Sequence, residues 1–184
     1  MPIQVYIALL RGINVSGQKL IKMENLRAAF TASGFHSVKT YIQSGNVIFT
    51  SEVADMQLLT LKIEKLIEDN FGFSTDVILR SMGDFESIVN DENFQKMKSN
   101  DEAKYYIVLT RSMEIADIQL PAFSKNNDVE IMQLGPGFAF CKATQFKGAF
   151  GFPNALLEKL TSAPATTRNP QTMQKLLELC SSLT

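Results

Sequence analysis

The order of the predicted elements in the first 80 residues limits the possible folds more than any other feature of the chain. The run QVYIALL, Gln4 to Leu10, is short and rich in β-forming residues, so it predicts a buried strand. A helix is expected over roughly residues 22–33, because apolar residues there repeat on one face. The runs SVKTYIQ and NVIFTS flank Ser44-Gly45 and indicate two strands joined by a hairpin.

A second helix and a fourth strand complete this pattern. Asp55 suits the N-cap of a long helix whose inward residues include Leu59 and Ile63, and Gly72 suits its end. The run TDVILR then predicts a strand. The resulting order is β-α-β-β-α-β, the ferredoxin-like arrangement. We therefore expect an α+β protein whose first lobe, residues 1–80, is ferredoxin-like.

Residues 81–184 are expected to form a second α+β lobe. The pattern predicts a helix after residue 81, a strand at KYYIVLT, a helix around residues 114–123, and a hairpin at Gly135-Pro136-Gly137. Two helices should close the chain, the second of them capped by Asn169, and pack back on the first lobe. Because no Pro/Gly/Ser-rich linker separates the halves, we expect the two lobes to pack tightly.

Composition narrows the functional classes. The net charge is −1, which argues against a protein that coats duplex nucleic acid. No stretch approaches the roughly 20 apolar residues that cross a bilayer, and the first residues lack a basic signal-peptide region, so a cytoplasmic protein without membrane contact is expected. Cys141 and Cys180 form no CxxC pair and are expected to be buried, reduced thiols.

The loop GINVSGQKL leaves the first strand with an unusual set of polar residues. Gly12 and Gly17 have the spacing of a phosphate-binding P-loop, but that motif continues with Lys and then Ser or Thr. Here Gln18, Lys19 and Leu20 follow, so the lysine is displaced and the hydroxyl is missing. A true P-loop is therefore disfavoured. The alternative is a loop whose glycines permit turns and whose lysines are solvated.

Two other segments carry candidate binding residues. In QSGN, Ser44 and Asn46 are typical tight-turn residues, yet the predicted topology can bring them near Arg11 and Asn14. In PATTRN, Arg168 precedes a capped helix, whose free N–H groups and positive dipole end favour an anion. Helix capping alone explains the asparagine that follows Arg168 but not the preceding Thr-Thr-Arg.

Familiar catalytic and metal-binding patterns are missing from the sequence. His36 is the single histidine, and nothing near it suggests a catalytic triad. One histidine and two separated cysteines do not form an ordinary zinc site, and no GxGxxG dinucleotide motif is present. We therefore expect no metal and no cofactor, and the sequence leaves catalysis open.

The motifs YIALLRGINVSG, KMENLRAAFTASGF, VKTYIQSGNVIF and PATTRN together resemble a family of uncharacterised bacterial proteins, domain of unknown function family 1697. The likeness covers nearly the whole chain and is densest over the first 50 residues. It implies a two-lobed α+β fold related to ferredoxin-like units. It implies no established activity.

Three functional hypotheses follow from the sequence. The first is a polar site between the lobes that binds a small anionic ligand bearing phosphate or carboxylate; its expected residues are Arg11, Asn14, Lys19, Ser44, Asn46 and Arg168. The second is a structural or protein-interaction module in which the arginines bond backbone carbonyls. The third is single-stranded nucleic-acid binding on an exposed aromatic sheet face. Oligomeric state stays open.

Overall fold

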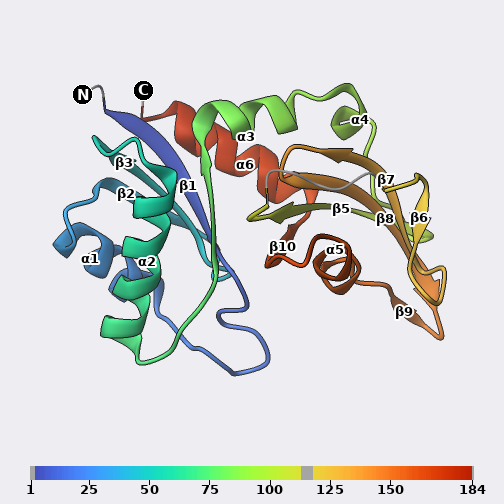
Figure 1. The fold of residues 1–184 in the computed structure, drawn as a ribbon, viewed down its shortest axis with the longest axis horizontal. Helices are drawn as coiled ribbons and strands as arrows, with labels where there is room; N and C mark the ends of the chain where they lie inside the picture. Colours follow the sequence, from blue (N-terminus) through green and yellow to red (C-terminus); the bar gives the residue numbers. More distant parts are fainter. Residues whose placement is uncertain (1–2, 113–117, 184) are drawn as a thin grey trace. The chain divides into compact units, whose positions relative to one another are not determined.

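The computed structural model describes residues 3–112 and 118–183 and confirms an α+β fold. The chain divides into two compact units (Figure 1). Unit 1 comprises Met1–Ser87 and Gln174–Thr184, and unit 2 comprises Ile88–Met173. Among the described residues, no helix combines the length and the apolar character that a membrane span requires.

Unit 1 is built on a four-stranded antiparallel sheet with the order β2-β3-β1-β4. The first 81 residues follow the predicted β-α-β-β-α-β order, with β1 at Gln4–Leu10, α1 at Met23–Ala32, β2 at His36–Tyr41, β3 at Asn46–Ser51, α2 at Met56–Phe71 and β4 at Val77–Ser81. The helix α3 (Met82–Val89) follows directly, and α6 (Pro170–Ser181) supplies most of the second stretch of unit 1 from residue 174 onward.

Successive side chains of a strand point to opposite faces of the sheet. One face of the unit 1 sheet is covered by α1 and α2, and a hydrophobic core lies between this face and the two helices (Figure 1). On β1, Tyr6, Ala8 and Leu10 face the two helices and are almost fully buried. The ring of Phe49 on β3 contacts an aromatic cluster beneath the helices, with its centroid 4.6 Å from that of Phe35. Every second residue of both strands thus contributes to one apolar layer.

Local capping explains where α2 begins and ends. The Asp55 carboxylate accepts hydrogen bonds from the backbone N–H groups of Gln57 and Leu58, at 2.9 and 3.0 Å. Gly72 ends the helix with a φ of 75°, a conformation that costs glycine little. Both predicted ends are confirmed.

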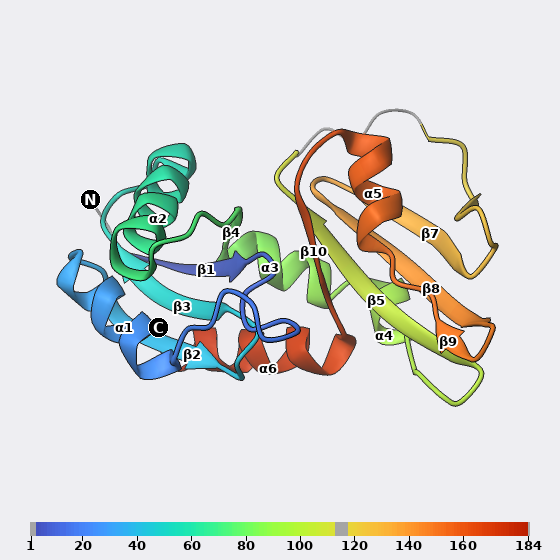
Figure 2. The same ribbon diagram turned by 90° about the horizontal axis from the view of Figure 1, so that it is seen from below.

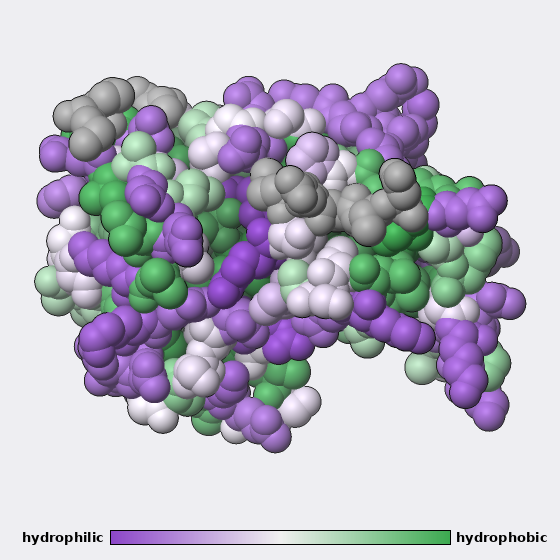
Figure 3. Space-filling model, in the orientation of Figure 1, coloured by the Kyte–Doolittle hydropathy of each residue, from purple (hydrophilic) through white to green (hydrophobic). Residues whose placement is uncertain are grey.

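The outer side of α2 is a mixed surface. Hydrophobic patches show over this helix among hydrophilic ones (Figure 3), and Leu58 and Leu61 are exposed there. Lys62 and Lys65 lie on the same exposed side, and the Lys62 ammonium lies 4.7 Å from the Phe35 ring centroid. Single exposed leucines between lysines are ordinary for a soluble surface.

Unit 2 contains a larger antiparallel sheet with the order β10-β5-β8-β7-β6, in which β9 pairs with β8 (Figure 2). Its elements are α4 (Glu92–Gln95), β5 (Ala103–Thr110), β6 (Ala122–Phe123), β7 (Val129–Gly135), β8 (Phe138–Phe146), β9 (Ala149–Phe150), α5 (Asn154–Thr161) and β10 (Ala165–Arg168). Leu157 of α5 packs on a core that includes Val108, Ile131 and Cys141.

The predicted hairpin between β7 and β8 is confirmed, since Gly135 pairs with Phe138. The C-terminal part of the helix expected around residues 114–123 is wrong, because Ala122 and Phe123 form β6 and pair with β7. The other part of that prediction, residues 113–117, lies outside the described residues. Pairing with β7 satisfies backbone groups that a helix would have bonded internally, which explains the strand.

The segment before α6 holds a strand that the sequence did not predict. Thr166, Thr167 and Arg168 belong to β10, which pairs antiparallel with β5. The predicted cap is confirmed, because the Asn169 Oδ1 atom accepts a hydrogen bond from the Thr172 N–H at 2.7 Å. The Thr-Thr-Arg run thus has a local structural explanation in addition to any role in binding.

Candidate functional site

The loop after β1 forms a small hairpin of its own, residues 14–19, called here the finger. The Gln18 N–H donates to the Val15 carbonyl at 2.9 Å, and the Asn14 N–H donates to the Lys19 carbonyl at 3.2 Å. Ser16 and Gly17 have φ values of 51° and 75°, as a type I′ turn requires. Gly17 therefore makes a turn, and the loop does not wrap a phosphate as a P-loop does.

Asn14 holds the base of the finger. Its side-chain amide donates to the carbonyls of Ile21 and Gln43, at 3.0 and 2.8 Å, and its Oδ1 atom accepts from the Ile21 N–H at 2.8 Å. The Leu10 N–H also donates to the Gly45 carbonyl at 2.8 Å. The structure thus brings the opening loop and the QSGN turn together, with Asn14 as the link.

Ser44 and Asn46 close the turn between β2 and β3. The Asn46 amide donates to the Tyr41 carbonyl and to the Ser44 hydroxyl, both at 3.0 Å. Asn46 is fully buried. These contacts are those of the tight-turn alternative, and they hold the Asn46 amide away from solvent.

Arg11 and Lys19 both reach the segment that precedes β4. The Arg11 guanidinium lies 3.7 Å from the Asp76 carboxylate, and both side chains are 39% exposed. The Lys19 ammonium donates to the Ser74 carbonyl at 2.8 Å. The Thr75 hydroxyl donates to the Arg11 carbonyl at 2.6 Å, which ties the two segments together.

A polar pocket of about 290 Å³ opens beside Lys19, and we call it the Lys19 pocket. It is lined by Lys19, Glu64, Glu68, Ser74, Thr75 and Asp76. Three carboxylates therefore face one ammonium. The Glu64 Oε1 atom accepts a hydrogen bond from the Val77 N–H at 3.0 Å, which fixes that carboxylate beside the start of β4.

The sequence predicted Lys19 as a binding residue but missed the acidic side of this pocket. Glu64 and Glu68 are four residues apart on α2 and therefore lie on one helix face. That spacing was the sequence signal that could have indicated the acidic side of the pocket. It is common on solvated helices, and only the fold places Asp76 beside it.

Arg168 belongs to unit 2, where it is buried on β10. Its Nη1 atom donates to the Thr166 hydroxyl and to the Thr167 carbonyl, both at 2.8 Å. Burial lowers the pKa of this guanidinium to about 10. Bonds to its own strand are the contacts expected for a structural role.

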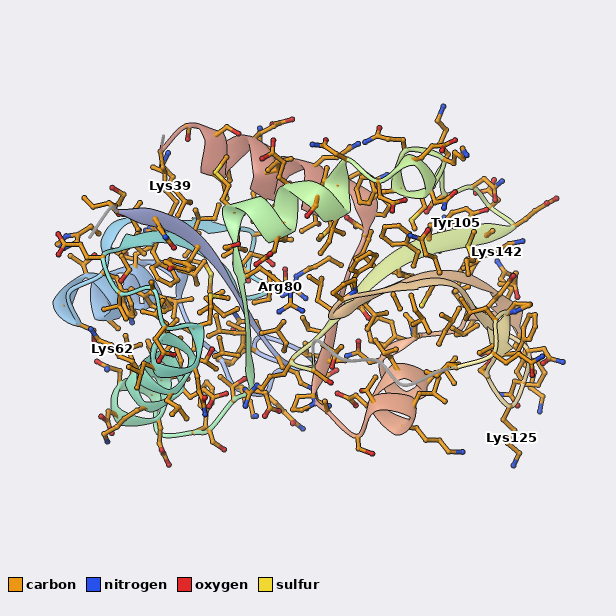
Figure 4. All side chains as sticks on the ribbon, turned by 45° about the horizontal axis from the view of Figure 1, so that its top comes forward. Lys39, Lys62, Arg80, Tyr105, Lys125 and Lys142 are labelled. Atoms are coloured by element: carbon orange, nitrogen blue, oxygen red, sulfur yellow. The ribbon has the colours of Figure 1, made fainter. Side chains whose placement is uncertain are left out.

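A second buried guanidinium, which the sequence reading missed, is Arg80 on β4 of unit 1 (Figure 4). Its Nη1 atom donates to the Leu79 carbonyl at 2.7 Å. Burial lowers the pKa of Arg80 to about 10, and the nearby Asp84 charge opposes that shift. An arginine within a strand gave no sequence signal for burial, because arginines are mostly exposed.

The aromatic residues of the unit 1 sheet are turned into the core. Tyr6 and Phe49 are almost fully buried, and their ring centroids lie 5.7 Å apart. The Tyr6 hydroxyl donates to the Gln4 side chain at 2.7 Å. Stacking of nucleic-acid bases requires exposed rings, so these two side chains are unavailable for it in the folded chain.

Comparison with known proteins identifies the family. The model of a family described as "Protein of unknown function (DUF1697)" matches residues 3–137. The chain belongs to this family. The match includes every residue of the Lys19 pocket and ends before Arg168. No curated protein matches the DUF1697 chain.

A solved structure shares the fold of this DUF1697 protein. It is described as the structure of conserved bacterial protein SP0830 from Streptococcus pneumoniae. The two chains are 23% identical with a TM-score of 0.70, and the alignment covers 97% of this chain and 99% of the other. At this identity the likeness shows the fold alone.

The two cysteines of the DUF1697 chain are free and buried, as expected. Burial raises the pKa of each thiol to about 12, and Lys39 opposes the shift at Cys180. Within the described part of the chain, no three His, Cys, Asp or Glu side chains are grouped so that they could hold a metal ion.

We predict that both thiols of the native protein react with Ellman's reagent at pH 8 at least about 100-fold more slowly than those of the urea-unfolded chain, because reaction requires local opening. The unfolded chain ionises its thiols near their ordinary pKa of 9.0, whereas the folded chain keeps them protonated. The contribution of the protonated thiols to the free energy of unfolding is therefore constant below about pH 9. It decreases between about pH 9 and 12. Rapid labelling of two thiols in the native protein would contradict the prediction.

Proposed function

We propose that this chain binds a small polar ligand in the Lys19 pocket, and that the ligand carries an ammonium group and hydroxyl groups. The charge of the lining carries the proposal: Glu64, Glu68 and Asp76 outnumber the one ammonium of Lys19. The Arg11 guanidinium lies 3.7 Å from Asp76, and with it included the group is still net negative. A carboxylate bonds a cationic donor more strongly than a neutral one. A ligand with amine and hydroxyl donors therefore complements this lining.

The rigidity of the surrounding elements supports the same proposal. Glu64 and Glu68 project from a long capped helix, and Lys19 leaves a finger closed by its own hydrogen bonds. Binding groups held on rigid elements lose little conformational freedom when a ligand arrives. Small ligands can be bound under those conditions with few contacts.

Titration calorimetry with glucosamine, which carries an ammonium group and hydroxyl groups, tests the proposal. We expect binding to the native chain, and Glu68→Gln should weaken it about tenfold, which corresponds to roughly 1.4 kcal/mol. Glu52→Gln is the matched control, because Glu52 is exposed in unit 1 outside the pocket. If Glu68→Gln and Glu52→Gln have equal effects, the proposed site is wrong.

The second candidate function is the binding of a small anion bearing phosphate or carboxylate. One observation favours it: Arg11 and Lys19 lie on the same loop, and the Arg11 side chain is partly exposed. In this alternative Asn14, Ser44 and Asn46 brace the loop, and the anion competes with Asp76 for Arg11. Arginine suits such ligands because its planar fork bonds two oxygens at once.

The variant Asp76→Asn should change amine affinity and anion affinity in opposite directions, so it distinguishes the two candidate functions. Removing this carboxylate should weaken the binding of an amine and strengthen the binding of inorganic phosphate or citrate. Arg11→Ala should abolish anion binding and leave amine binding within about twofold. If neither class of ligand binds, the structural or protein-interaction alternative gains support.

A further inference from the structure

Unit 2 contains a pocket that the sequence did not suggest, called here the Phe152 pocket. Its volume is about 470 Å³, within the range of roughly 300–1,000 Å³ typical of small-molecule sites. The turn after β6 forms one wall and the start of α5 forms the other. Its main lining residues are Phe123, Lys125, Val129, Phe152, Leu156 and Lys159.

The pocket has an apolar interior with exposed aromatic walls. Val129 is buried, and Leu156 packs against the same core cluster of unit 2. Phe123 and Phe152 are 49% and 61% exposed, although phenylalanine is usually buried. An apolar, aromatic lining with a few polar groups at its edge is typical of small-ligand sites.

The turn that forms one wall is already ordered. The Ser124 hydroxyl donates to the Asp128 carboxylate at 2.5 Å and accepts from the backbone N–H groups of Asp128 and Val129, at 3.1 and 3.0 Å. The Asn127 N–H donates to the Ser124 carbonyl at 3.0 Å. This network also occupies the Asp128 carboxylate, which is the acidic group among the lining residues.

Gly151 fixes the opposite wall, the one that carries Phe152. A Cβ atom at this position would lie 2.6 Å from the Asp128 carbonyl oxygen and 2.6 Å from the Val129 Cγ2 atom. The backbone at residue 151 therefore approaches the turn more closely than any side chain would allow. Thr144 of β8 joins the two walls, since its N–H donates to Asp128 and its carbonyl accepts from Gly151.

Two lysines, Lys125 and Lys159, are among the lining residues of this apolar space. Lys125 extends outward from the turn (Figure 4), and Lys159 is exposed on α5. With Asp128 included, the lining carries a net charge of +1. A ligand that combines an apolar body with a negative group would bury the first against the phenylalanines and place the second near the lysines.

We propose that the Phe152 pocket binds a small aromatic carboxylate. The aromatic ring contacts Phe123 and Phe152, where aromatic pairs gain more than their buried area alone provides. The carboxylate is neutralised by Lys125 and Lys159. This site lies in the other unit from the Lys19 pocket and prefers the opposite ligand charge, so it is a binding activity beyond the proposed function.

Binding of 2-naphthoate, followed by titration calorimetry against its neutral analogue 2-naphthamide, tests the inference. Phe152→Ala should weaken the binding of both compounds about tenfold, since the apolar wall is lost. The double variant Lys125→Gln with Lys159→Gln should weaken 2-naphthoate about tenfold and leave 2-naphthamide within twofold. All three residues are exposed, so the variants should fold normally.

Matched controls come from the same unit. Phe146 is 40% exposed and lies outside the pocket lining, with the Lys147 ammonium 5.4 Å from its ring centroid. Phe146→Ala and Lys147→Gln should leave both affinities unchanged. The inference is overturned if 2-naphthoate fails to bind at millimolar concentration, if Phe152→Ala has no effect, or if the controls weaken binding equally. Glu68→Gln should not change naphthoate binding, so failure of this site and failure of the Lys19 pocket are distinguishable.

Discussion

Gly45→Ala should destabilise unit 1 by about 3 kcal/mol. Gly45 has a φ of 74°, and a left-handed conformation costs a non-glycine residue roughly 1–2 kcal/mol. The added Cβ atom would also lie 2.9 Å from both the Ile13 Cγ1 atom and the Leu10 Cβ atom. Overpacking of this kind adds roughly 1–3 kcal/mol. The turn would have to move away from β1 to relieve the clash.

Gly34→Ala provides the matched control. Gly34 has a similar φ of 82°, yet apart from Gly34 and its two chain neighbours no residue has a heavy atom within 4 Å of the position that its Cβ atom would take. Gly34→Ala should destabilise unit 1 by about 1 kcal/mol, because only the left-handed backbone conformation disfavours alanine there. Hydrogen exchange of β1 and β3 amides, which reports on unit 1 separately, measures both variants. Equal losses of protection would show that the contact with Leu10 and Ile13 is unimportant.

Phe49→Ala should destabilise unit 1 by about 3–5 kcal/mol, the usual cost of deleting a buried aromatic ring. The Phe49 ring is fully buried among three others, with centroids 4.6 Å from Phe35 and 5.7 Å from both Phe30 and Tyr6. Its removal leaves a cavity where the sheet meets α1. These neighbours lie on β1, on α1 and in the loop that joins α1 to β2, so they have little freedom to close the gap.

Phe49→Leu separates ring loss from cavity formation. Leucine fills much of the same space, so it should cost less than half as much as alanine. Phe146→Ala, at an exposed ring of unit 2, should change stability by less than about 0.5 kcal/mol. Urea unfolding measures all three variants, and hydrogen exchange in β3 measures the two Phe49 variants in unit 1. Similar losses for Phe49→Ala and Phe49→Leu would contradict the cavity argument.

Elements specified by neighbouring residues could be predicted from the sequence. Asp55 and Gly72 mark the ends of α2 through contacts within one helical turn, and Asn169 does the same at the start of α6. The hairpin at Gly135 likewise depends on residues that are adjacent in the chain. Such signals survive in a single sequence because the atoms that interact are only a few residues apart.

Elements that depend on distant partners were missed or misassigned. The short strand β10 exists because Arg168 pairs with Ile107 and Ala165 pairs with Thr110 on β5. Likewise β6 is held by β7, and its two residues carry no strand signal of their own. Pairing across such separations is a property of the folded sheet, which local residue preferences do not encode.

The candidate site likewise has one part that could be predicted from the sequence and another part that could not. The QSGN turn was expected from the topology to lie near Asn14, and the Asn14 amide does bond the Gln43 carbonyl of that turn. The acidic side of the Lys19 pocket was missed because Glu64 lies on α2 and Asp76 lies in the segment before β4, and the two meet only after folding. The Phe152 pocket likewise forms only after folding, because its two walls are joined through Gly151 and Thr144.

The division of unit 1 into two stretches of chain has a consequence for protein synthesis. A ribosome adds roughly 5–20 residues per second, so several seconds separate the emergence of Met1–Ser87 from that of Gln174–Thr184. During this interval the nascent unit 1 lacks the segment that supplies buried Leu176 and Cys180 and the Ser182 hydroxyl that Lys39 bonds. Translation therefore completes unit 2 before unit 1, although unit 1 begins first.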